Sequence, residues 1–210
     1  MSKLPNINRK HRVCVICEGN EDHAYLQKLV NLSVWNKIYD FKLINVKSAS
    51  NIFPKYQNEY NNNSYEIILV FCDTDKSPYK QYVPIKKKIN EFHDRPSASG
   101  KIIIFANPCT MQIILLHFGE ICLKKQGKKT NSDIILQLTG VENYDAHEEQ
   151  IEIICKQINR QNYEIMKQRV VKINNSDTTS GSTNFSDFIE KFESDDPKWI
   201  EGINKYLSIK

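Results

Sequence analysis

Short apolar runs alternate with segments of helical spacing along the first 120 residues of the chain. Runs that are apolar on both faces and bounded by polar residues predict buried strands, and they occur at 12–17 and 67–72. Further strands are expected at 41–46 and 101–105. Between them, apolar residues spaced by three and four predict helices over 21–32, with Asn20 as N-cap, over 80–92 and over 110–118. This alternation predicts an α/β fold with a mainly parallel, Rossmann-like sheet flanked by helices.

The pattern changes beyond about residue 120. Helices are expected at 148–161, 185–192 and 198–207, the last after the start signal Asp195-Asp196-Pro197. Polar or basic connectors are expected at 58–64, 93–100 and 124–129, and a Ser/Thr/Asn/Gly tract at 174–183 predicts a mobile loop with little to bury. We therefore expect an α/β core over residues 1–120. A mostly helical C-terminal extension over 121–210 is expected to pack on or beside it.

Three carboxylates stand where predicted strands end. Glu18 follows the first strand, and Asp73 and Asp75 follow the third. Parallel sheets bind ligands beyond the carboxyl ends of their strands, and residues two apart on an extended segment point to the same face. Converging carboxylates repel one another, and a bound hard cation relieves that repulsion. The pattern predicts a Mg²⁺ site, with Mn²⁺ as the alternative ion, whereas the simplest alternative is that these acids are solvated turn formers or helix caps.

Composition narrows the class of protein only slightly. The chain has 210 residues, 40% hydrophobic and 26% charged, with a net charge of +4, which permits a nucleic-acid partner without requiring one. It contains no run of about 18 apolar residues, and residues 1–10 lack the hydrophobic core of a signal peptide. We expect a cytoplasmic protein with no membrane partner.

The six cysteines offer a second candidate chemistry. Cys14 and Cys17 form a C-x-x-C pair, which is compatible with zinc or redox chemistry. However, the pair lies inside a predicted strand, where residues three apart face opposite sides, and the other cysteines form no second close pair. Buried thiols acting as small hydrophobic groups are the favoured interpretation.

Two segments carry a resemblance to a known family. Glu18-Gly-Asn-Glu-Asp22, followed by Tyr25-Leu26 and by Asp73-Thr-Asp75, resembles the Toprim domain of topoisomerases, bacterial primases, OLD-family nucleases and small RNA-maturing nucleases. The segment from Asn107-Pro108 to His117-Phe118 is similar to the N-P-x-F-E-x-W-x-L-L-H-F segment of RloB-like proteins, Toprim-type proteins of bacterial defence loci. The Phe, Glu and Trp of that segment are Thr110, Met111 and Ile113 here. The resemblance covers about residues 12–118.

The resemblance implies roles for the carboxylates. In Toprim enzymes the glutamate and the aspartate pair hold one or two Mg²⁺ ions at a phosphodiester, which assigns Glu18, Asp73 and Asp75 as catalytic and metal-binding residues. Glu18 is expected to ligate metal, to act as general acid or base, or to do both. Asp22 is a further candidate ligand, although an acid in a first helical turn also favours the helix dipole alone. Lys76 follows the pair and is a candidate to neutralise a phosphate, or else an ordinary surface lysine.

Further residues are candidates for substrate binding. Lysines on the predicted helix 80–92 and in the loop 124–129 either track phosphates or form solvated faces. Asn107 either positions the site or begins the turn before Pro108, and a packed structural role is favoured for His117. The lysines concerned are Lys86, Lys87 and Lys88, with Lys124, Lys125, Lys128 and Lys129.

The leading hypothesis is a Mg²⁺-dependent nuclease that hydrolyses RNA or DNA. By family resemblance it would act in anti-phage defence of the abortive-infection type, with an ATPase partner encoded in the same locus. The alternative is a non-catalytic nucleic-acid-binding or regulatory subunit, which the Met111 departure favours. A nucleotide-binding sensor that uses the same carboxylates is a third hypothesis. The sequence contains no ATP-binding P-loop motif. Assembly into a homo-oligomer stays open.

Overall fold

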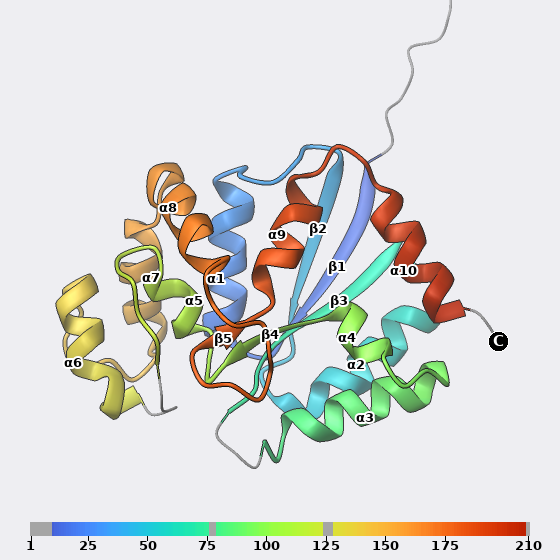
Figure 1. The fold of residues 1–210 in the computed structure, drawn as a ribbon, viewed down its shortest axis with the longest axis horizontal. Coiled ribbons are helices and arrows are strands. Elements are labelled where there is room, and N and C mark those ends of the chain that lie inside the picture. Colours follow the sequence, from blue (N-terminus) through green and yellow to red (C-terminus); the bar gives the residue numbers. More distant parts are fainter. Residues whose placement is uncertain (1–9, 76–78, 124–127, 209–210) are drawn as a thin grey trace, which may run out of the picture.

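The apolar runs form the centre of a five-stranded sheet with the order β2-β1-β3-β4-β5 (Figure 1). The computed structural model describes residues 10–75, 79–123 and 128–208. The first four strands pair in parallel, and the short β5 pairs antiparallel to β4. The predicted α/β fold with a mainly parallel sheet flanked by helices is therefore confirmed. The strands are β1 (His11–Cys17), β2 (Tyr39–Asn45), β3 (Ile67–Asp73), β4 (Ile103–Asn107) and β5 (Ser182–Thr183).

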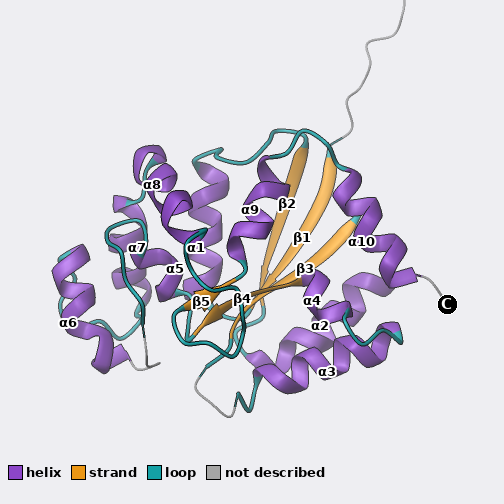
Figure 2. Cartoon of the chain, in the orientation of Figure 1, coloured by secondary structure: helices purple, strands orange, loops and turns teal. Residues whose placement is uncertain are grey.

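Helices cover both faces of this sheet (Figure 2). On one face lie α1 and α9, and on the other α2, which pairs with α3. The helices are α1 (Asn20–Asn31), α2 (Ala49–Asn61), α3 (Tyr82–His93), α4 (Ala98–Ile102), α5 (Met111–Leu115), α6 (Lys128–Thr139), α7 (Glu148–Gln157), α8 (Arg160–Val170), α9 (Phe185–Glu193) and α10 (Lys198–Ser208).

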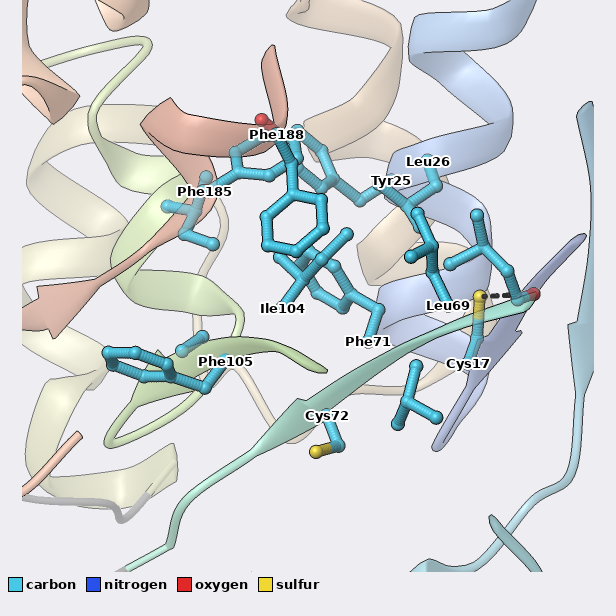
Figure 3. Close-up of a cluster of buried hydrophobic side chains, with 14 of the residues drawn as sticks. Cys17, Tyr25, Leu26, Leu69, Phe71, Cys72, Ile104, Phe105, Phe185 and Phe188 are labelled. Carbon is cyan, nitrogen blue, oxygen red and sulfur yellow. Dashed lines mark hydrogen bonds between the residues drawn. The ribbon is translucent and has the colours of Figure 1, made fainter. Parts of the chain in front are cut away.

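Aromatic side chains join α1 and α9 to the central strand. The rings of Phe71 in β3 and Phe185 in α9 meet edge to face at 5.7 Å, and Tyr25 of α1 contacts the same Phe185 ring at 6.2 Å. Figure 3 shows this cluster above β3, whereas Cys72 points to the opposite side of the strand, as the strand period of two requires. Burying a large apolar side chain contributes roughly 1.5–3 kcal/mol, so this cluster fixes α1 and α9 on the sheet.

Successive strands are added to one side of β1 and then to the other, so the direction of strand addition switches between β1 and β3. From β1 the chain passes through α1 to β2 at the edge, and then crosses by α2 to β3 on the other side of β1. The carboxyl ends of β1 and β3 therefore flank the point where such sheets open a crevice for ligands. Glu18 and Asp73 lie at these two ends.

Several predicted elements differ from those observed. Helix α2 was not predicted, because Pro54 interrupts its pattern, and it extends into the predicted connector 58–64. Helix α4 occupies the end of the predicted loop 93–100, and α6 begins inside the predicted basic loop. The predicted helix 148–161 is two helices, since Ile158 is extended and Asn159 starts α8 by accepting a bond from Asn162 N. The N-cap of α1 is Gly19 rather than Asn20.

The polar tract 174–183 is anchored to the core, contrary to the prediction of a mobile loop with little to bury. The Asn107 side chain donates to the Asp177 carbonyl at 2.8 Å, and the Thr183 hydroxyl donates to the Phe105 carbonyl at 2.5 Å. Ser182 and Thr183 are fully buried in β5. Small hydroxyl side chains satisfy backbone groups here, so the end of the tract at 181–183 is buried although it is polar, while much of 174–180 stays exposed. Part of the expected C-terminal extension therefore belongs to the α/β core, because β5 pairs with β4 and α9 packs on the sheet.

The cysteines are all free thiols. Burial raises the pKa of both Cys14 and Cys17. The next largest cause is the charge of Glu59 in α2 for Cys14 and the charge of Asp22 in α1 for Cys17. Because α1 and α2 cover opposite faces of the sheet, the two thiols face opposite sides of β1, as predicted. Cys122 is exposed, which contradicts the interpretation of every thiol as a buried hydrophobic group. Among the described helices, none combines the length and the apolar character needed to cross a membrane.

Candidate functional site

Glu18 extends the pairing of β1 with β3 by one residue. Its backbone N–H donates to the Phe71 carbonyl at 3.2 Å, and its carboxylate accepts from the Asp73 N–H at 3.2 Å. The carboxylate is thus held against the end of β3. Burial, and after it the negative charge of Asp75, raise the pKa of Glu18 to about 7, against the opposing effect of the bond from Asp73 N–H.

Asp22 is the third residue of α1 and points back into the site. Its carboxylate accepts from the Gly19 N–H at 3.0 Å, which satisfies one of the unpaired amides at the helix start. It also accepts from the Thr110 hydroxyl, and only 3% of the residue is exposed. Burial raises the pKa of Asp22 to about 8, with added repulsion from Glu18 and Glu21, while the two hydrogen bonds lower it.

Asp73 is the last residue of β3, and Thr110 holds it in place. One Asp73 carboxylate oxygen accepts from the Thr110 N–H at 2.8 Å and lies 3.0 Å from the Thr110 hydroxyl. Burial raises the pKa of Asp73 well above its ordinary value, followed by the charges of Asp22, Glu18 and Glu21. The Thr110 hydroxyl has one hydrogen but contacts both Asp22 and Asp73, so satisfying both contacts requires a proton on a carboxyl.

Asp75 reaches the cluster by a turn rather than by strand alternation. Its φ of +60° is left-handed, and its backbone N–H donates to the Pro108 carbonyl at 3.1 Å. The premise that 73–75 continues as an extended segment is therefore wrong. Asp75 nevertheless belongs to the same electrostatic group, because its charge raises the pKa of Glu18.

Glu18, Asp22 and Asp73 line a cavity of about 450 Å³ at the carboxyl ends of the central strands, whereas Asp75 is not among its lining residues. One wall comes from the end of β1, the start of α1 and the end of β3, and it is polar. The opposite wall comes from α5, α6, α7 and the loop 140–147, and its Tyr144 hydroxyl donates to the Glu21 carboxylate. The lining residues are Glu18, Gly19, Asn20, Glu21, Asp22, Lys47, Asp73, Cys109, Met111, Asn131, Ile135, Tyr144, Ala146, Glu148 and Ile151.

This donor set suits a hard divalent cation in its chemistry. Carboxylate oxygens are the ligands of Mg²⁺, and a bound cation would offset the burial and mutual repulsion of Glu18, Asp22 and Asp73. The side-chain positions are not a ready coordination group, however. Within the described ranges, no three or more His, Cys, Asp or Glu side chains are arranged so that they could hold a metal ion. Metal binding at this cluster would therefore require side-chain rearrangement.

The structure does not bring the candidate lysines of α3 to the cavity. Lys86 is ion-paired with Asp177 and lies 5.4 Å from the centre of the Tyr82 ring, which ties it to the tract 174–183. Lys87 is largely exposed and 3.7 Å from Glu91. Neither lines the cavity, whereas Lys47, which sequence reasoning missed, does. Lys76, Lys124 and Lys125 lie outside the described residues.

Asn107 and His117 have packing roles. Asn107 is buried, forms a cis peptide bond with Pro108, and uses its side chain to hold the tract 174–183 rather than to line the cavity. The His117 ring lies 3.0 Å from the Tyr25 hydroxyl and 3.3 Å from the side-chain amide oxygen of Asn162. Burial lowers the pKa of His117 to about 4, and the prediction of a packed structural histidine is confirmed.

Sequence reasoning missed the second wall of the cavity except for Met111. The sequence did draw attention to Thr110, because Thr110 stands where the similar segment of RloB-like proteins has Phe. Tyr144, Ile135 and Ile151 had no such signal, because they lie more than 60 residues beyond Asp73 in a region without a recognisable motif. In comparisons with protein families, curated proteins and solved structures, nothing matches the chain. The Toprim resemblance therefore stays a prediction from the motifs.

Proposed function

We propose that this protein is a Mg²⁺-dependent hydrolase of phosphodiester bonds in nucleic acid. The observation that carries the proposal is the gathering of Glu18, Asp22 and Asp73 from three separate elements onto one cavity at the β1/β3 crevice. A purely structural origin is unattractive for three mutually repelling carboxylates, of which Asp22 is buried and Glu18 and Asp73 are half-buried. Burying carboxylates without a compensating cation costs stability. A cation-binding role accounts for that cost.

In this proposal Glu18, Asp22, Asp73 and Asp75 hold the cation. When bound, the metal would polarise the phosphoryl oxygen and stabilise the leaving oxygen. Burial raises the pKa of Glu18 to about 7 in the metal-free protein. Glu18 would act as a ligand of the cation or, where it does not ligate the cation, as a general acid or base. Lys47 lines the same cavity and would balance phosphate charge there.

A non-catalytic binding subunit is the second candidate function. The observation that favours it is the lack of a ready metal-coordinating group among the described side chains. A binder would also retain the cavity and Lys47 without needing turnover. Anti-phage defence, an ATPase partner and a cytoplasmic location rest on the sequence alone and stay predictions.

The two functions separate in one cleavage experiment. Purified protein is incubated with tRNA, single-stranded RNA, single-stranded DNA and duplex DNA, each with Mg²⁺, Mn²⁺ or EDTA. The Asp73→Asn/Asp75→Asn double variant removes two carboxylate charges at the site. Asp40→Asn is the matched control, because Asp40 is exposed near the amino end of β2, at the opposite edge of the sheet.

We expect metal-dependent cleavage by the wild type and by Asp40→Asn, reduced at least a hundredfold in the double variant. Cleavage that survives the double substitution would overturn the assignment of these carboxylates. Binding without cleavage under every metal, unchanged in the double variant, would replace the hydrolase by the binding subunit.

A further inference from the structure

The positive charge of the chain is concentrated in one segment. Residues 79–101 contain five lysines and one arginine against one glutamate and one aspartate, a net charge of +4 that equals the net charge of the whole chain. The remainder of the chain is therefore neutral in sum. Residues 79–101 include α3 and most of α4, which contact each other, so the excess charge belongs to one side of the sheet layer.

Three of these lysines are available to a partner. Lys80, in the turn before α3, and Lys87 and Lys88, on α3, are exposed. Lys87 pairs with Glu91 at 3.7 Å, but the two side chains are 73% and 62% exposed. An ion pair at such exposed positions contributes only about 0–1 kcal/mol, so it does not withhold Lys87 from a stronger anionic partner.

Lys88 carries the positive charge of α3 to the seam with α2. Its ammonium group lies 5.9 Å from the centre of the Phe53 ring of α2. Lys86 has a different task, because its ion pair with Asp177 holds the tract 174–183. Lys86 is therefore not part of the surface that α3 offers to a partner.

The neighbouring helix α2 adds amides and no exposed acid. Among the described residues from 47 to 90, no aspartate or glutamate is exposed. Glu59 of α2 is buried and paired with Lys55 at 2.6 Å, so its charge is largely compensated. We define the α2–α3 face as Lys80, Lys87 and Lys88 together with the exposed amide side chains of α2 and the turn after it. These amides are Asn51, Gln57, Asn58, Asn61, Asn62 and Asn63.

The α2–α3 face begins at the same edge of the sheet as the carboxylate cavity. Helices α2 and α3 lie on the side of the sheet away from α1 and α9 (Figure 1). Helix α2 starts directly after the turn that contains Lys47, a lining residue of the cavity. Lys80 is five residues beyond Asp75, and five residues span at most about 18 Å, so the face starts within that distance of the site.

The chemistry of this face fits nucleic acid better than a lipid surface. A helix that lies in a membrane interface needs an exposed apolar side. The apolar residues Ile85 and Ile89 of α3 are buried against the core, and among the residues of α2 and α3 only Val83 is a large apolar side chain that is exposed. Lysines and amides without an apolar side are the groups that contact phosphate and sugar oxygens.

We infer that the α2–α3 face binds the sugar–phosphate backbone of nucleic acid, beside the bond held at the carboxylates and without reading the base sequence. The inference rests on the proposed function for the identity of the partner. The binding itself needs neither metal nor cleavage.

Binding in EDTA measures the α2–α3 face without cleavage. Fluorescence anisotropy follows short labelled duplex DNA and single-stranded RNA over about 50–200 mM KCl, the range in which phosphate contacts are strongly salt-dependent. Lys80→Gln/Lys87→Gln/Lys88→Gln removes three exposed charges. Each phosphate contact on duplex DNA contributes about 0.9 to the slope of log affinity against log salt, so we expect a slope shallower by about 2–3 and an affinity at least about tenfold lower.

A matched triple variant controls for total charge. Lys37→Gln/Lys156→Gln/Lys172→Gln removes three exposed lysines before β2, on α7 and after α8. We expect this variant to keep the salt slope of the wild type. Equal weakening by the two triple variants would overturn the inference, as would a wild type that binds no nucleic acid at the lowest salt. Binding of phosphatidylserine vesicles in place of nucleic acid would overturn it in favour of a membrane surface.

Added acids test the part of the face that α2 provides. Gln57→Glu/Asn58→Asp places two negative charges among the amides of α2, whereas Gln161→Glu/Gln168→Glu places two on exposed positions of α8. We expect only the α2 pair to weaken binding of nucleic acid. Equal effects of the two pairs, with both proteins folded by circular dichroism, would overturn the inference.

Cleavage kinetics keep the two proposals apart. Metal-dependent cleavage by the α3 triple variant with the KM and the salt dependence of the wild type would overturn the α2–α3 face and leave the hydrolase intact. Binding that the α3 triple variant loses and Asp73→Asn/Asp75→Asn retains, without cleavage under any metal, would support the face and overturn the hydrolase.

Discussion

Replacing Asp22 by asparagine should stabilise the metal-free protein at neutral and alkaline pH. The Asp22 carboxyl is 3% exposed, and burial raises its pKa to about 8 from an ordinary value of 3.8. Asparagine has the same shape and can still accept from the Gly19 N–H, while its amide can donate to the Thr110 hydroxyl. The substitution thus removes a buried charge without removing its hydrogen bonds.

The pH dependence sets the size of the effect. Because the folded pKa lies above the unfolded one, the folded protein holds a proton that the unfolded chain has released between about pH 4 and pH 8. Stability therefore falls as pH rises through this window, at about 1.4 kcal/mol per pH unit for one proton. From pH 5 to pH 7 the wild type should lose about 3 kcal/mol relative to Asp22→Asn.

Urea unfolding in EDTA at half-unit intervals from pH 5 to pH 8 measures this difference. Subtracting the two curves removes contributions that both proteins share, including those of the histidines. Asp187→Asn is the control, since Asp187 is an exposed acid in the first turn of α9 and loses only a favourable dipole interaction. A wild-type advantage at pH 8, or a difference that does not change with pH, would refute the buried-charge reasoning.

Four further substitutions test the fold. Gly181→Ala should lower the free energy of unfolding by about 2 kcal/mol or more in urea titrations, because Gly181 has φ +73° and a Cβ there would overlap the Cys122 side chain. Gly202→Ala in α10 places its Cβ in open space and should raise the free energy of unfolding by up to about 1 kcal/mol. His117→Gln should make stability less dependent on pH below pH 6.5. In the wild type the folded pKa of His117 is about 4 and the unfolded pKa is 6.5, so stability falls by about 1.4 kcal/mol per pH unit as pH falls through that window. An equal pH dependence in the variant would contradict this. Phe185→Ala should cost about 3–5 kcal/mol by thermal or urea unfolding, and a loss below 1 kcal/mol would show that the α1–α9 cluster does not hold the sheet layer.

The sequence predicted the part of the fold that depends on local pattern. The strands β1 and β3 each contain a continuous apolar run, at 13–17 and 67–72, so they were predictable, and Glu18 and Asp73 follow these runs at once. Helix α2 was missed because Pro54 lies inside it, and β5 was missed because it has two residues and is polar. Such elements form through tertiary contacts that no local pattern records.

The candidate site shows the same division. Its carboxylate wall could be predicted, since strand ends of a parallel sheet converge, although the reason given for Asp75 was wrong. The wall of Tyr144, Ile135 and Ile151 could not be predicted, because its position depends on how α6 and α7 pack near α1. Lys47, in the turn after β2, became a site residue only through the sheet order.

Calorimetric titration of Mg²⁺ and Mn²⁺ into the metal-free protein tests the central claim most directly. If Glu18, Asp22, Asp73 and Asp75 form the cation site at the β1/β3 crevice, the wild type and Asp40→Asn bind with a saturable heat at pH 8. Asp73→Asn/Asp75→Asn, which leaves Glu18 and Asp22 in place, loses that heat. Equal heats in all three proteins, or no saturable heat in the wild type with either ion, would contradict the claim that this cluster is a metal centre.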